Sequence, residues 1–342
     1  MKDPRDVRDY EGQLVQGTEP VTRLPFGVSS YYAGLARTED PRSDPIAAQY
    51  IPTEKELSSL PYESTDPIGD TRFLVTARLV RHYHDRALLL VSDRCATYCR
   101  FCFRRHFTGH GGGHISAEQL DEACAYLSRT RSVREILLSG GDPLMLSDKD
   151  LEQVMSRLKQ VDPDFILRVC TRMPVVLPSR VTEDLARMLG SFGSVWVVVH
   201  ANHPRELTDE FRRGMRLLLR AGVPALNQSV LLQGVNDDAD VLEQLFRGLV
   251  RSGVKPYYLF QGDLASGTAH FRVPLERGIE LMGELRARLS GLALPTYAVD
   301  LPGGGKVPVE SALLRMEQDA YVFRGPDSAE YRYPREGGRP PH

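Results

Sequence analysis

Three cysteines within one short stretch are the residues whose types and spacing point most clearly to chemistry. Cys95, Cys99 and Cys102 form a C-x3-C-x2-C pattern. Thiolates are the ligands that iron–sulfur clusters require, and a short loop can hold three corners of a cubane. Three protein ligands leave one iron open, and the methionyl amino and carboxylate groups of S-adenosylmethionine (SAM) suit such an iron. The pattern therefore indicates a [4Fe-4S] cluster that binds SAM.

A zinc site, or simple packing of the cysteines in the core, is the alternative interpretation. Structural zinc takes four ligands, and His106 is near enough along the chain to act as the fourth. Zinc sites usually contain paired cysteine motifs, and a second C-x2-C pair is absent from the sequence. The cluster is therefore favoured, and metal analysis distinguishes the two.

Two glycine-rich segments add further candidate residues. Ser139, Gly140, Gly141 and Asp142 form one of them; its glycines allow close approach to a ligand, and Asp142 suits an ammonium group, although Gly-Gly-Asp is also an ordinary turn. In the other, Lys306 follows three glycines, and a lysine on such a loop can form a Schiff base with pyridoxal 5'-phosphate (PLP). A solvated surface lysine is the alternative. The scarcity of lysine, with six in the chain, favours the PLP interpretation.

These segments lie between alternating strand and helix patterns. Apolar runs predict strands at 87–92, 135–139, 165–171, 195–200, 225–232 and 256–261. Amphipathic stretches predict helices at 116–129, 148–160, 182–189, 206–221 and 238–252, with capping residues at Ser116 and Thr182. The alternation predicts an α/β fold with parallel strands, and six such units make a partial (β/α)6 barrel or a curved open sheet.

The polar segments follow the ends of the predicted strands, where the active sites of β/α barrels are built. We expect residues 1–85 to form a helical and irregular N-terminal extension, 86–262 the barrel core, and 263–342 a C-terminal segment. That last segment should hold a helix at 274–289, an extended run at 295–299 and a tail whose last dozen residues are loosely ordered.

Composition limits the class of protein. The chain has 342 residues, of which 42% are hydrophobic and 26% are charged, as in globular proteins with a sizeable core. A net charge of -2 gives no reason to expect nucleic acid or an anionic membrane as a partner. No apolar run is long enough to span a membrane, and the five cysteines do not form a disulfide framework. We therefore expect a cytoplasmic protein.

The spaced motifs of this chain resemble those of the lysine 2,3-aminomutases, radical SAM enzymes that use PLP. The resemblance runs from about residue 75 to about residue 310. It rests on CFRRHF at 102–107, LLSGGDPL at 137–144, TRMPVVLP at 171–178, HANHP at 200–204, NQSVLLQGVN at 227–236, PYYL at 256–259, HFR at 270–272 and PGGGK at 302–306. It implies a partial radical-SAM barrel with a helical N-terminal extension and a short C-terminal segment.

The resemblance also implies roles for the residues that match the family's motifs. Cys95, Cys99 and Cys102 would ligate the cluster, and Lys306 would hold PLP. The other cofactor-binding residues it implies are Tyr83 and Arg86 at the PLP phosphate, and Ser139, Gly140, Gly141, Asp142, His200 and Gln228. The substrate-binding residues it implies are Arg104 for the carboxylate, and Asp263 and Asp300 for the distal ammonium of lysine.

The aspartate pair bears on the substrate, because two anionic groups bind a side-chain cation and repel a glutamate carboxylate. The expected activity is therefore that of an isomerase that moves the α-amino group of L-lysine to the β carbon, giving β-lysine. The same mechanism on arginine or glutamate is an alternative, as is β-lysine supply for modification of translation elongation factor P. The alternative from a different class is a non-catalytic iron–sulfur or zinc-binding protein.

The resemblance implies partners as well, and the sequence departs from the family's pattern at several points. The implied partners are an amino acid substrate, an electron donor such as flavodoxin or ferredoxin, and further copies of the chain. Three glycines precede Lys306 where the lysine enzymes typically have four, and His82 and Phe101 replace an arginine and a histidine. No cysteine follows Cys170, so the C-terminal zinc site of longer members cannot form.

Overall fold

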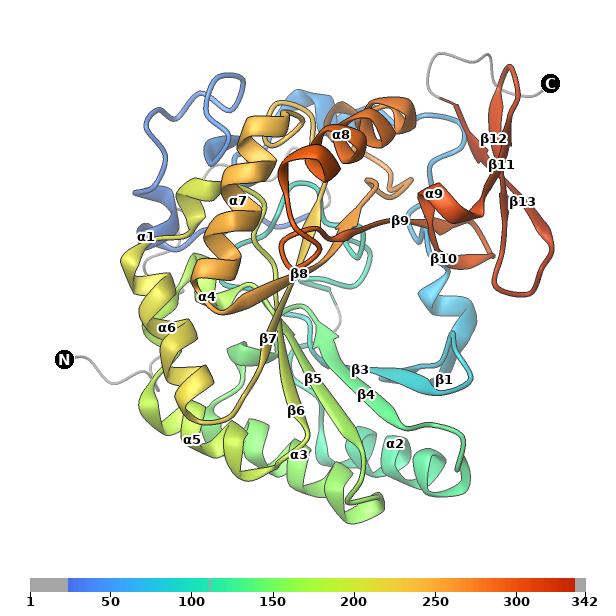
Figure 1. The fold of residues 1–342 in the computed structure, drawn as a ribbon. Helices are drawn as coiled ribbons and strands as arrows, with labels where there is room; N and C mark the ends of the chain where they lie inside the picture. The colour runs from blue at the N-terminus through green and yellow to red at the C-terminus, as the bar shows by residue number, and fades with distance from the viewer. Residues whose placement is uncertain (1–23, 111, 336–342) are drawn as a thin grey trace.

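A curved sheet of mostly parallel strands forms the core of the computed structural model, which describes residues 24–110 and 112–335 (Figure 1). The sheet runs in sequence order from β1 to β10, and neighbouring strands from β3 to β9 are parallel. The parallel strands are β3 (Arg86–Ser92), β4 (Glu135–Gly140), β5 (Ile166–Thr171), β6 (Val195–Val199), β7 (Ala225–Val230), β8 (Val254–Phe260) and β9 (Thr296–Leu301). The predicted α/β fold with a partial barrel of six β/α units is confirmed.

Helices cover the outer face of this sheet (Figure 1). Those that follow the strands are α2 (Ala117–Arg129), α3 (Asp148–Val161), α5 (Glu183–Ser191), α6 (Asp209–Arg220), α7 (Ala239–Arg251) and α8 (Leu275–Arg288). Each carries one apolar stripe that packs on the strands, as Leu242, Leu245 and Phe246 do from α7. The predicted caps are confirmed, because Ser116 and Thr182 accept backbone N–H bonds at the starts of α2 and α5.

The alternation of side chains along each strand separates the core from the cavity. On β5, Leu167 and Val169 are buried under the helices, whereas Arg168 and Cys170 point to the barrel interior. The same period places alternate residues of β4, β7 and β8 on the inner face. The inner face therefore carries polar side chains, which a packed barrel core would not tolerate.

The N-terminal extension is built from single turns and irregular chain rather than long helices. It contains α1 (Ser30–Ala33), η2 (Ala47–Gln49), η3 (Glu54–Leu57) and η4 (Asp70–Phe73), followed by the short strands β1 (Leu74–Thr76) and β2 (Leu79–Val80). The two strands, which the sequence did not indicate, add to the sheet edge beside β3. We call residues 53–73 the strap, because they run across the mouth of the barrel and contact the loops there.

The two ends of the open sheet approach each other at the cavity. Beyond β9, the strand β10 (Gly305–Pro308) returns antiparallel as the last strand of the sheet. The backbone N–H of Lys306 donates to the hydroxyl of Tyr83, in the turn before β3, at 3.1 Å. Residues from the start and the end of the barrel therefore meet across the gap.

A small sheet completes the described chain. After α9 (Val309–Ala312), three antiparallel strands pack beside the barrel: β11 (Leu313–Met316), β12 (Ala320–Arg324) and β13 (Glu330–Pro334) (Figure 1). The expectation that the last dozen residues are loosely ordered is wrong for the part within β13, because Tyr333 is buried against the core. Residues 336–342 lie outside the described part of the chain. The remaining short helical segments are α4 (Met173–Val176), η5 (Pro143–Met145), η6 (Pro178–Arg180), η7 (Pro204–Glu206) and η8 (Ala269–Phe271).

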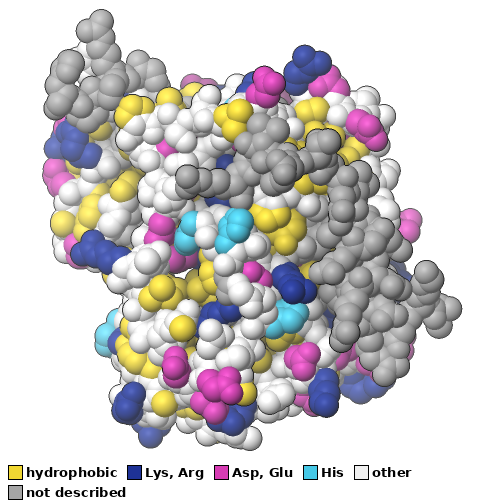
Figure 2. All heavy atoms as spheres, turned by 180° about the vertical axis from the view of Figure 1, so that it is seen from behind, with side chains coloured by type: hydrophobic (Ala, Val, Ile, Leu, Met, Phe, Trp, Pro, Cys, Tyr) yellow, Lys and Arg dark blue, Asp and Glu magenta, His cyan; other side chains and the backbone are white. Residues whose placement is uncertain are grey.

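The surface matches the near-neutral composition. On the face seen in Figure 2, acidic and basic side chains are interspersed, and hydrophobic ones are scattered between them. No helix among the described residues combines the length and the apolar character that crossing a bilayer requires.

We predict that Gly278 of α8 tolerates no side chain. A Cβ atom there would lie 2.0 Å from Oη of Tyr297, which is buried and donates to Gln261 at 2.5 Å. Gly278→Ala should lower the free energy of unfolding by about 1–3 kcal/mol through overpacking. Gly283→Ala, in open space on the same helix, should raise it by up to about 1 kcal/mol. Urea unfolding midpoints check both, and equal shifts for the two variants would contradict the packing argument.

Candidate active site

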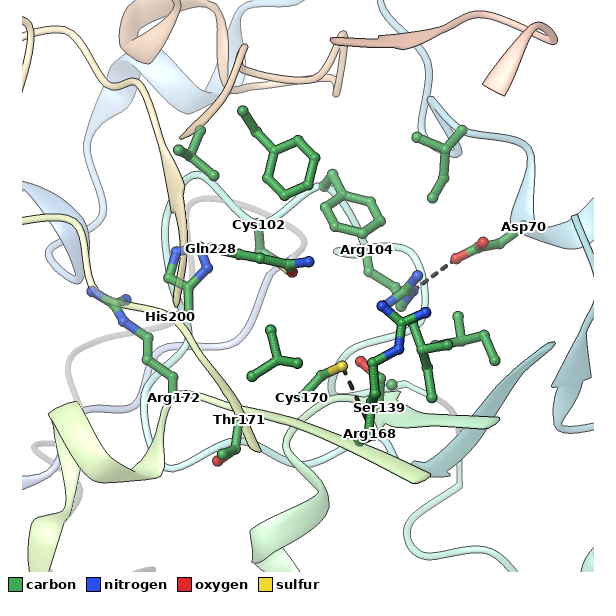
Figure 3. A pocket seen from close by; sticks show the side chains of 18 of the residues that line it. Asp70, Cys102, Arg104, Ser139, Arg168, Cys170, Thr171, Arg172, His200 and Gln228 are labelled. Carbon is green, nitrogen blue, oxygen red and sulfur yellow. Dashed lines mark hydrogen bonds and ion pairs between the residues drawn. The ribbon is translucent and has the colours of Figure 1, made fainter. Parts of the chain in front are cut away.

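One cavity of about 480 Å³ at the carboxyl ends of the strands collects every site residue predicted from the sequence (Figure 3). They come from the turn before β3 and the first residue of that strand, the cysteine loop after it, the end of β4 and the residues that follow, the residue after β6, strand β7, the segment after β8, and the β9–β10 hairpin. The cavity is lined by Tyr83, Arg86, Cys95, Cys99, Cys102, Arg104, Ser139, Gly140, Gly141, Asp142, His200, Gln228, Asp263, Asp300 and Lys306, among others. Residues far apart in the sequence thus share one site.

Buried ion pairs connect the cysteine loop to the N-terminal extension. The guanidinium of Arg100 is fully buried and donates to both oxygens of Glu56 in the strap, at 2.9 and 2.7 Å, and Arg105 donates to the same carboxylate at 2.6 Å. The backbone N–H of Arg100 also bonds to Gln49. These contacts tie the loop that carries the three thiols to the strap and to η2.

The three thiols are donors of the type that an iron–sulfur cluster needs. Burial, and next the charge of Asp142, raises the pKa of Cys95; burial, and next the charge of Cys99, raises that of Cys102, so cluster binding must displace protons. Among the described residues, no three His, Cys, Asp or Glu side chains lie close enough together to hold a single metal ion. Three thiols on one short loop are the donor set that a [4Fe-4S] cluster with one open iron takes.

The glycines of the Ser139–Asp142 segment are needed mainly for backbone packing. A Cβ on Gly140 would lie 2.3 Å from the carbonyl oxygen of Ser92, and one on Gly141 would lie 2.4 Å from that of Arg94. Asp142 accepts bonds from the hydroxyl of Thr171 and from backbone N–H groups at the start of α4 and η5. Its carboxylate thus ties β4 to β5, and its predicted contact with a ligand ammonium stays a prediction.

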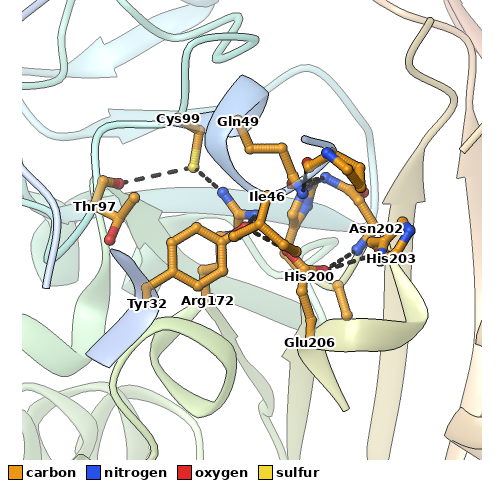
Figure 4. A network of polar contacts seen from close by, with 12 residues as sticks. Tyr32, Ile46, Gln49, Thr97, Cys99, Arg172, His200, Asn202, His203 and Glu206 are labelled. Carbon is orange, nitrogen blue, oxygen red and sulfur yellow. Dashed lines mark hydrogen bonds and ion pairs between the residues drawn. The ribbon is translucent and has the colours of Figure 1, made fainter. Parts of the chain in front are cut away.

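A buried network connects the cysteine loop to the N-terminal extension (Figure 4). Its centre is Arg172, which donates through Nη1 to Sγ of Cys99 at 2.7 Å. Through Nη2 it reaches Tyr32 at 2.8 Å, Gln49 at 2.6 Å and Glu206 at 2.9 Å. A guanidinium stabilises negative charge on the sulfur that it contacts, and hydrogen bonds to ligand sulfurs are one way in which proteins tune iron–sulfur potentials.

His200 contributes a neutral ring to the cavity wall. Burial, and next the charge of Arg172, lowers the pKa of His200 to about 3, so its imidazole is uncharged at neutral pH. The ring stacks on Phe101, with 5.5 Å between ring centroids and 17° between planes. Phe101, which replaces a histidine of the family pattern, thereby fills one wall of the site with a flat apolar surface.

Lys306 lies directly opposite Asp300 in the β9–β10 hairpin. Side chains at opposed positions share one face of a sheet, and Nζ of Lys306 is 4.0 Å from Asp300. The three-residue turn that produces this register requires positive φ at Gly303 and Gly305. Nζ also lies 4.3 Å from the ring centroid of Phe260. The amine therefore faces the cavity, as a lysine that binds PLP must.

Three further arginines line the cavity. Arg86 lies over the ring of Tyr83, with 3.8 Å between Cζ and the ring centroid. Arg168, on the inner face of β5, pairs with Glu135 of β4 at 2.5 Å. Arg104 lines the same cavity and is 7% exposed. These guanidinium groups suit anions such as a phosphate and a carboxylate.

Asp263 and Asp300 are two interacting carboxyl groups that line the cavity. Burial and the nearby charge of Asp300 raise the pKa of Asp263 to about 8, and the positive charges of Lys306, Arg104 and Arg272 oppose the shift. Two carboxyl groups that repel each other in this way gain stability from a bound cation. The cavity therefore contains both carboxyl and guanidinium groups, which suit a ligand that carries charges of both signs.

Several cavity residues were not predicted as site residues. Arg168 and Cys170 could have been found from the period of two along β5, since the sequence already located that strand. Asp70 belongs to the strap, and no local pattern links it to Arg104, 34 residues away. Its role depends on tertiary contacts alone.

Comparisons with known proteins agree with this geometry. Residues 89–245 match the profile of the Radical SAM superfamily. An L-lysine 2,3-aminomutase of Clostridium subterminale is 43% identical over 306 residues, which cover 89% of this chain and 73% of that protein. A glutamate 2,3-aminomutase of Clostridioides difficile is 38% identical over 303 residues, covering 88% and 71% of the two chains. A radical SAM methyltransferase structure from Sphaerobacter thermophilus aligns with a TM-score of 0.49 and 21% identity over 65% of this chain and 68% of its own.

We predict that the three loop cysteines, and no others, hold the iron. After anaerobic reconstitution, the wild type should contain about four irons with matching sulfide, as a [4Fe-4S] cluster requires. Most of the iron and most of the sulfide should be lost in each of the variants Cys95→Ala, Cys99→Ala and Cys102→Ala. Cys124→Ala, in α2, is the matched control and should keep its iron. Full iron and sulfide in all three loop variants would contradict the assignment.

The raised pKa of Asp263 predicts a pH dependence of stability in the ligand-free protein. Between the unfolded-state pKa of an aspartate, about 3.9, and the folded value of about 8, the folded chain keeps a proton that the unfolded chain has lost. Stability should therefore fall as pH rises through this range, and Asp263→Asn should reduce that fall. Thermal unfolding from pH 5 to pH 8 compares the two proteins. If the stability of the wild type and of Asp263→Asn depended on pH in the same way, Asp263 would ionise as an ordinary aspartate does.

Proposed function

The chain belongs to the lysine 2,3-aminomutase family of radical SAM enzymes, and we propose that it converts L-lysine to β-lysine by moving the α-amino group to the β carbon. It is a radical SAM aminomutase with a [4Fe-4S] cluster, SAM and PLP as cofactors. The observation that carries the choice of substrate is the pair Asp263 and Asp300, in the same cavity as Arg104 and Lys306.

The residues divide the work of binding. Cys95, Cys99 and Cys102 would hold the cluster, and Lys306 would hold PLP. When bound, the cluster would supply the electron for reductive cleavage of SAM, and PLP would carry the migrating nitrogen. Tyr83, which already accepts the backbone N–H of Lys306, would fix the lysine loop against the first strands of the sheet.

The charged groups of the cavity support an amino acid with a cationic side chain. Arg104 would take the α-carboxylate through its remaining N–H groups, and Asp263 and Asp300 would take the distal ammonium. Such a ligand pairs with the guanidinium and with the carboxylates at once. Its ammonium favours the charged form of Asp263. Because the strap and the β9–β10 hairpin border the cavity, water is limited around a reactive radical.

Glutamate is disfavoured by the same charges. Its side-chain carboxylate would meet two aspartates, which costs binding free energy unless further protons are taken up. Arginine is the closer competitor, because a guanidinium also pairs with carboxylates, although it is larger than an ammonium and planar. A substrate panel therefore decides between lysine and arginine.

The reaction needs a reductant, and we propose a flavodoxin or a ferredoxin as the donor. We also propose that the enzyme is a cytoplasmic homo-oligomer. The family and the near-neutral composition support these proposals. Sedimentation of the reconstituted protein and reduction assays with each donor test them.

We predict that the reconstituted enzyme, supplied with SAM, PLP and dithionite under anaerobic conditions, forms β-lysine from L-lysine. Products from lysine, arginine and glutamate are separated by chromatography and identified by mass. Lysine should be converted faster than the other two. β-Arginine or β-glutamate as the main product, with no β-lysine, would overturn the substrate assignment.

The aspartate pair has matched variants for the same assay. Asp263→Asn and Asp300→Asn should each lower kcat/KM for lysine about 10- to 100-fold, the range expected for a lost hydrogen bond to a charged group. Asp164→Asn, an exposed aspartate in the turn before β5, should leave kcat/KM unchanged. If neither cavity variant differed from this control, the pair would not bind the substrate.

A further inference from the structure

The guanidinium of Arg104 is held by one carboxylate from the strap (Figure 3). Its Nε donates to Oδ2 of Asp70 at 2.7 Å. Within residues 24–110 and 112–335, the guanidinium makes no other hydrogen bond, so Nη1 and Nη2 are left for a ligand. A guanidinium bound through Nε alone keeps the pair of donors that suits a carboxylate.

Asp70 is itself fixed on both sides. Its backbone N–H and that of Thr71 donate to the two oxygens of Asp66, at 2.9 and 2.8 Å, which anchors the turn η4. The Asp70 side chain is buried, and its residue is 3% exposed. Burial would raise the pKa of this carboxyl, but Arg104 and His82 hold it well below its usual range. Asp70 is therefore a fixed anion.

His82 faces the second oxygen of this carboxylate. Its Nε2 lies 3.3 Å from Oδ1 of Asp70, although neither atom has the geometry of a hydrogen bond. The imidazole packs against Phe73, with 4.0 Å between ring centroids and 39° between the ring planes. The next residue is Tyr83, whose hydroxyl accepts the backbone N–H of Lys306. Asp70 thus lies between the arginine at the cluster loop and the turn that supports the PLP lysine.

We infer that Asp70 is a positioning residue that orients Arg104 for the α-carboxylate of the substrate, with His82 as its second support. The inference rests on the proposed function and deepens it. Two effects of Asp70 oppose each other, since its charge repels a carboxylate while its bond to Nε fixes the plane of the guanidinium. Because Arg104 already neutralises Asp70 at 2.7 Å, the orienting effect dominates.

The test compares two ligands that differ in the carboxylate alone. L-Lysine and 1,5-diaminopentane carry the same terminal amines, and each is titrated into the PLP-loaded enzyme while the visible absorbance of PLP is followed. In Asp70→Asn, the Kd of lysine should rise about tenfold, a loss typical of one charge-assisted contact. The Kd of the diamine should change less than about twofold, because it makes no contact with Arg104.

Controls separate positioning from a structural role. Glu54→Gln removes an exposed carboxylate from the same strap and should change neither Kd. His82→Phe keeps a ring beside Phe73 and loses Nε2, so the Kd of lysine should rise about threefold. This variant also tests the inference if Asp70→Asn does not fold. Asp70→Glu should recover part of the lysine affinity.

Equal losses for lysine and the diamine, or an unchanged Kd for lysine, would overturn the inference while leaving the proposed function intact. If the wild type binds arginine rather than lysine, the same comparison is made with arginine and its decarboxylated amine. A wild type whose PLP spectrum responds to no amino acid would overturn the proposed function, and the role of Asp70 with it.

Discussion

Buried arginines at the mouth of the barrel must each be neutralised, and this constraint organises the site. An unpaired buried charge destabilises a protein by several kcal/mol, so each guanidinium needs a carboxylate partner. The strap supplies three of these carboxylates, and each is buried in its ion pair. Glu56 pairs with Arg100 and Arg105, Glu63 with Arg272, and Asp70 with Arg104. These ion pairs explain why the N-terminal extension packs over the cysteine loop although it has little regular secondary structure.

The same need for charge neutralisation determines which ligand charges the cavity can bind. Where arginine donors are left over, as on Arg104, an anion completes the pairing; where carboxylates crowd, as with Asp263 and Asp300, a cation does. A zwitterionic amino acid with a distal ammonium meets both needs. The β9–β10 hairpin sets Lys306 opposite Asp300 through its register. Its backbone also contacts Tyr83, which lies near the other end of the sheet. The shorter glycine turn therefore still presents the lysine to the cavity.

Local signals predicted what depends on local sequence. The strands, the helices with their caps at Ser116 and Thr182, and the gathering of motifs at one rim all follow from periodicity and from the geometry of parallel sheets. The strands β11 and β13 were missed because exposed arginines and acidic residues pair around them and mask the apolar alternation. The strand β12, whose first four residues are all buried, was missed although it is a short apolar run. The links from Asp70 to Arg104 and from Arg172 to Cys99 join segments with no shared pattern, so only the folded chain reveals them.

The central claim is that a radical formed at the three-cysteine loop reaches the β carbon of an amino acid held between Arg104 and the aspartate pair. Its most direct test is the transfer of deuterium from L-lysine labelled at the β carbon, in the reconstituted enzyme with SAM, PLP and a reductant. The account predicts that 5'-deoxyadenosine acquires deuterium from the lysine. If 5'-deoxyadenosine forms without deuterium, or does not form at all, the account is contradicted.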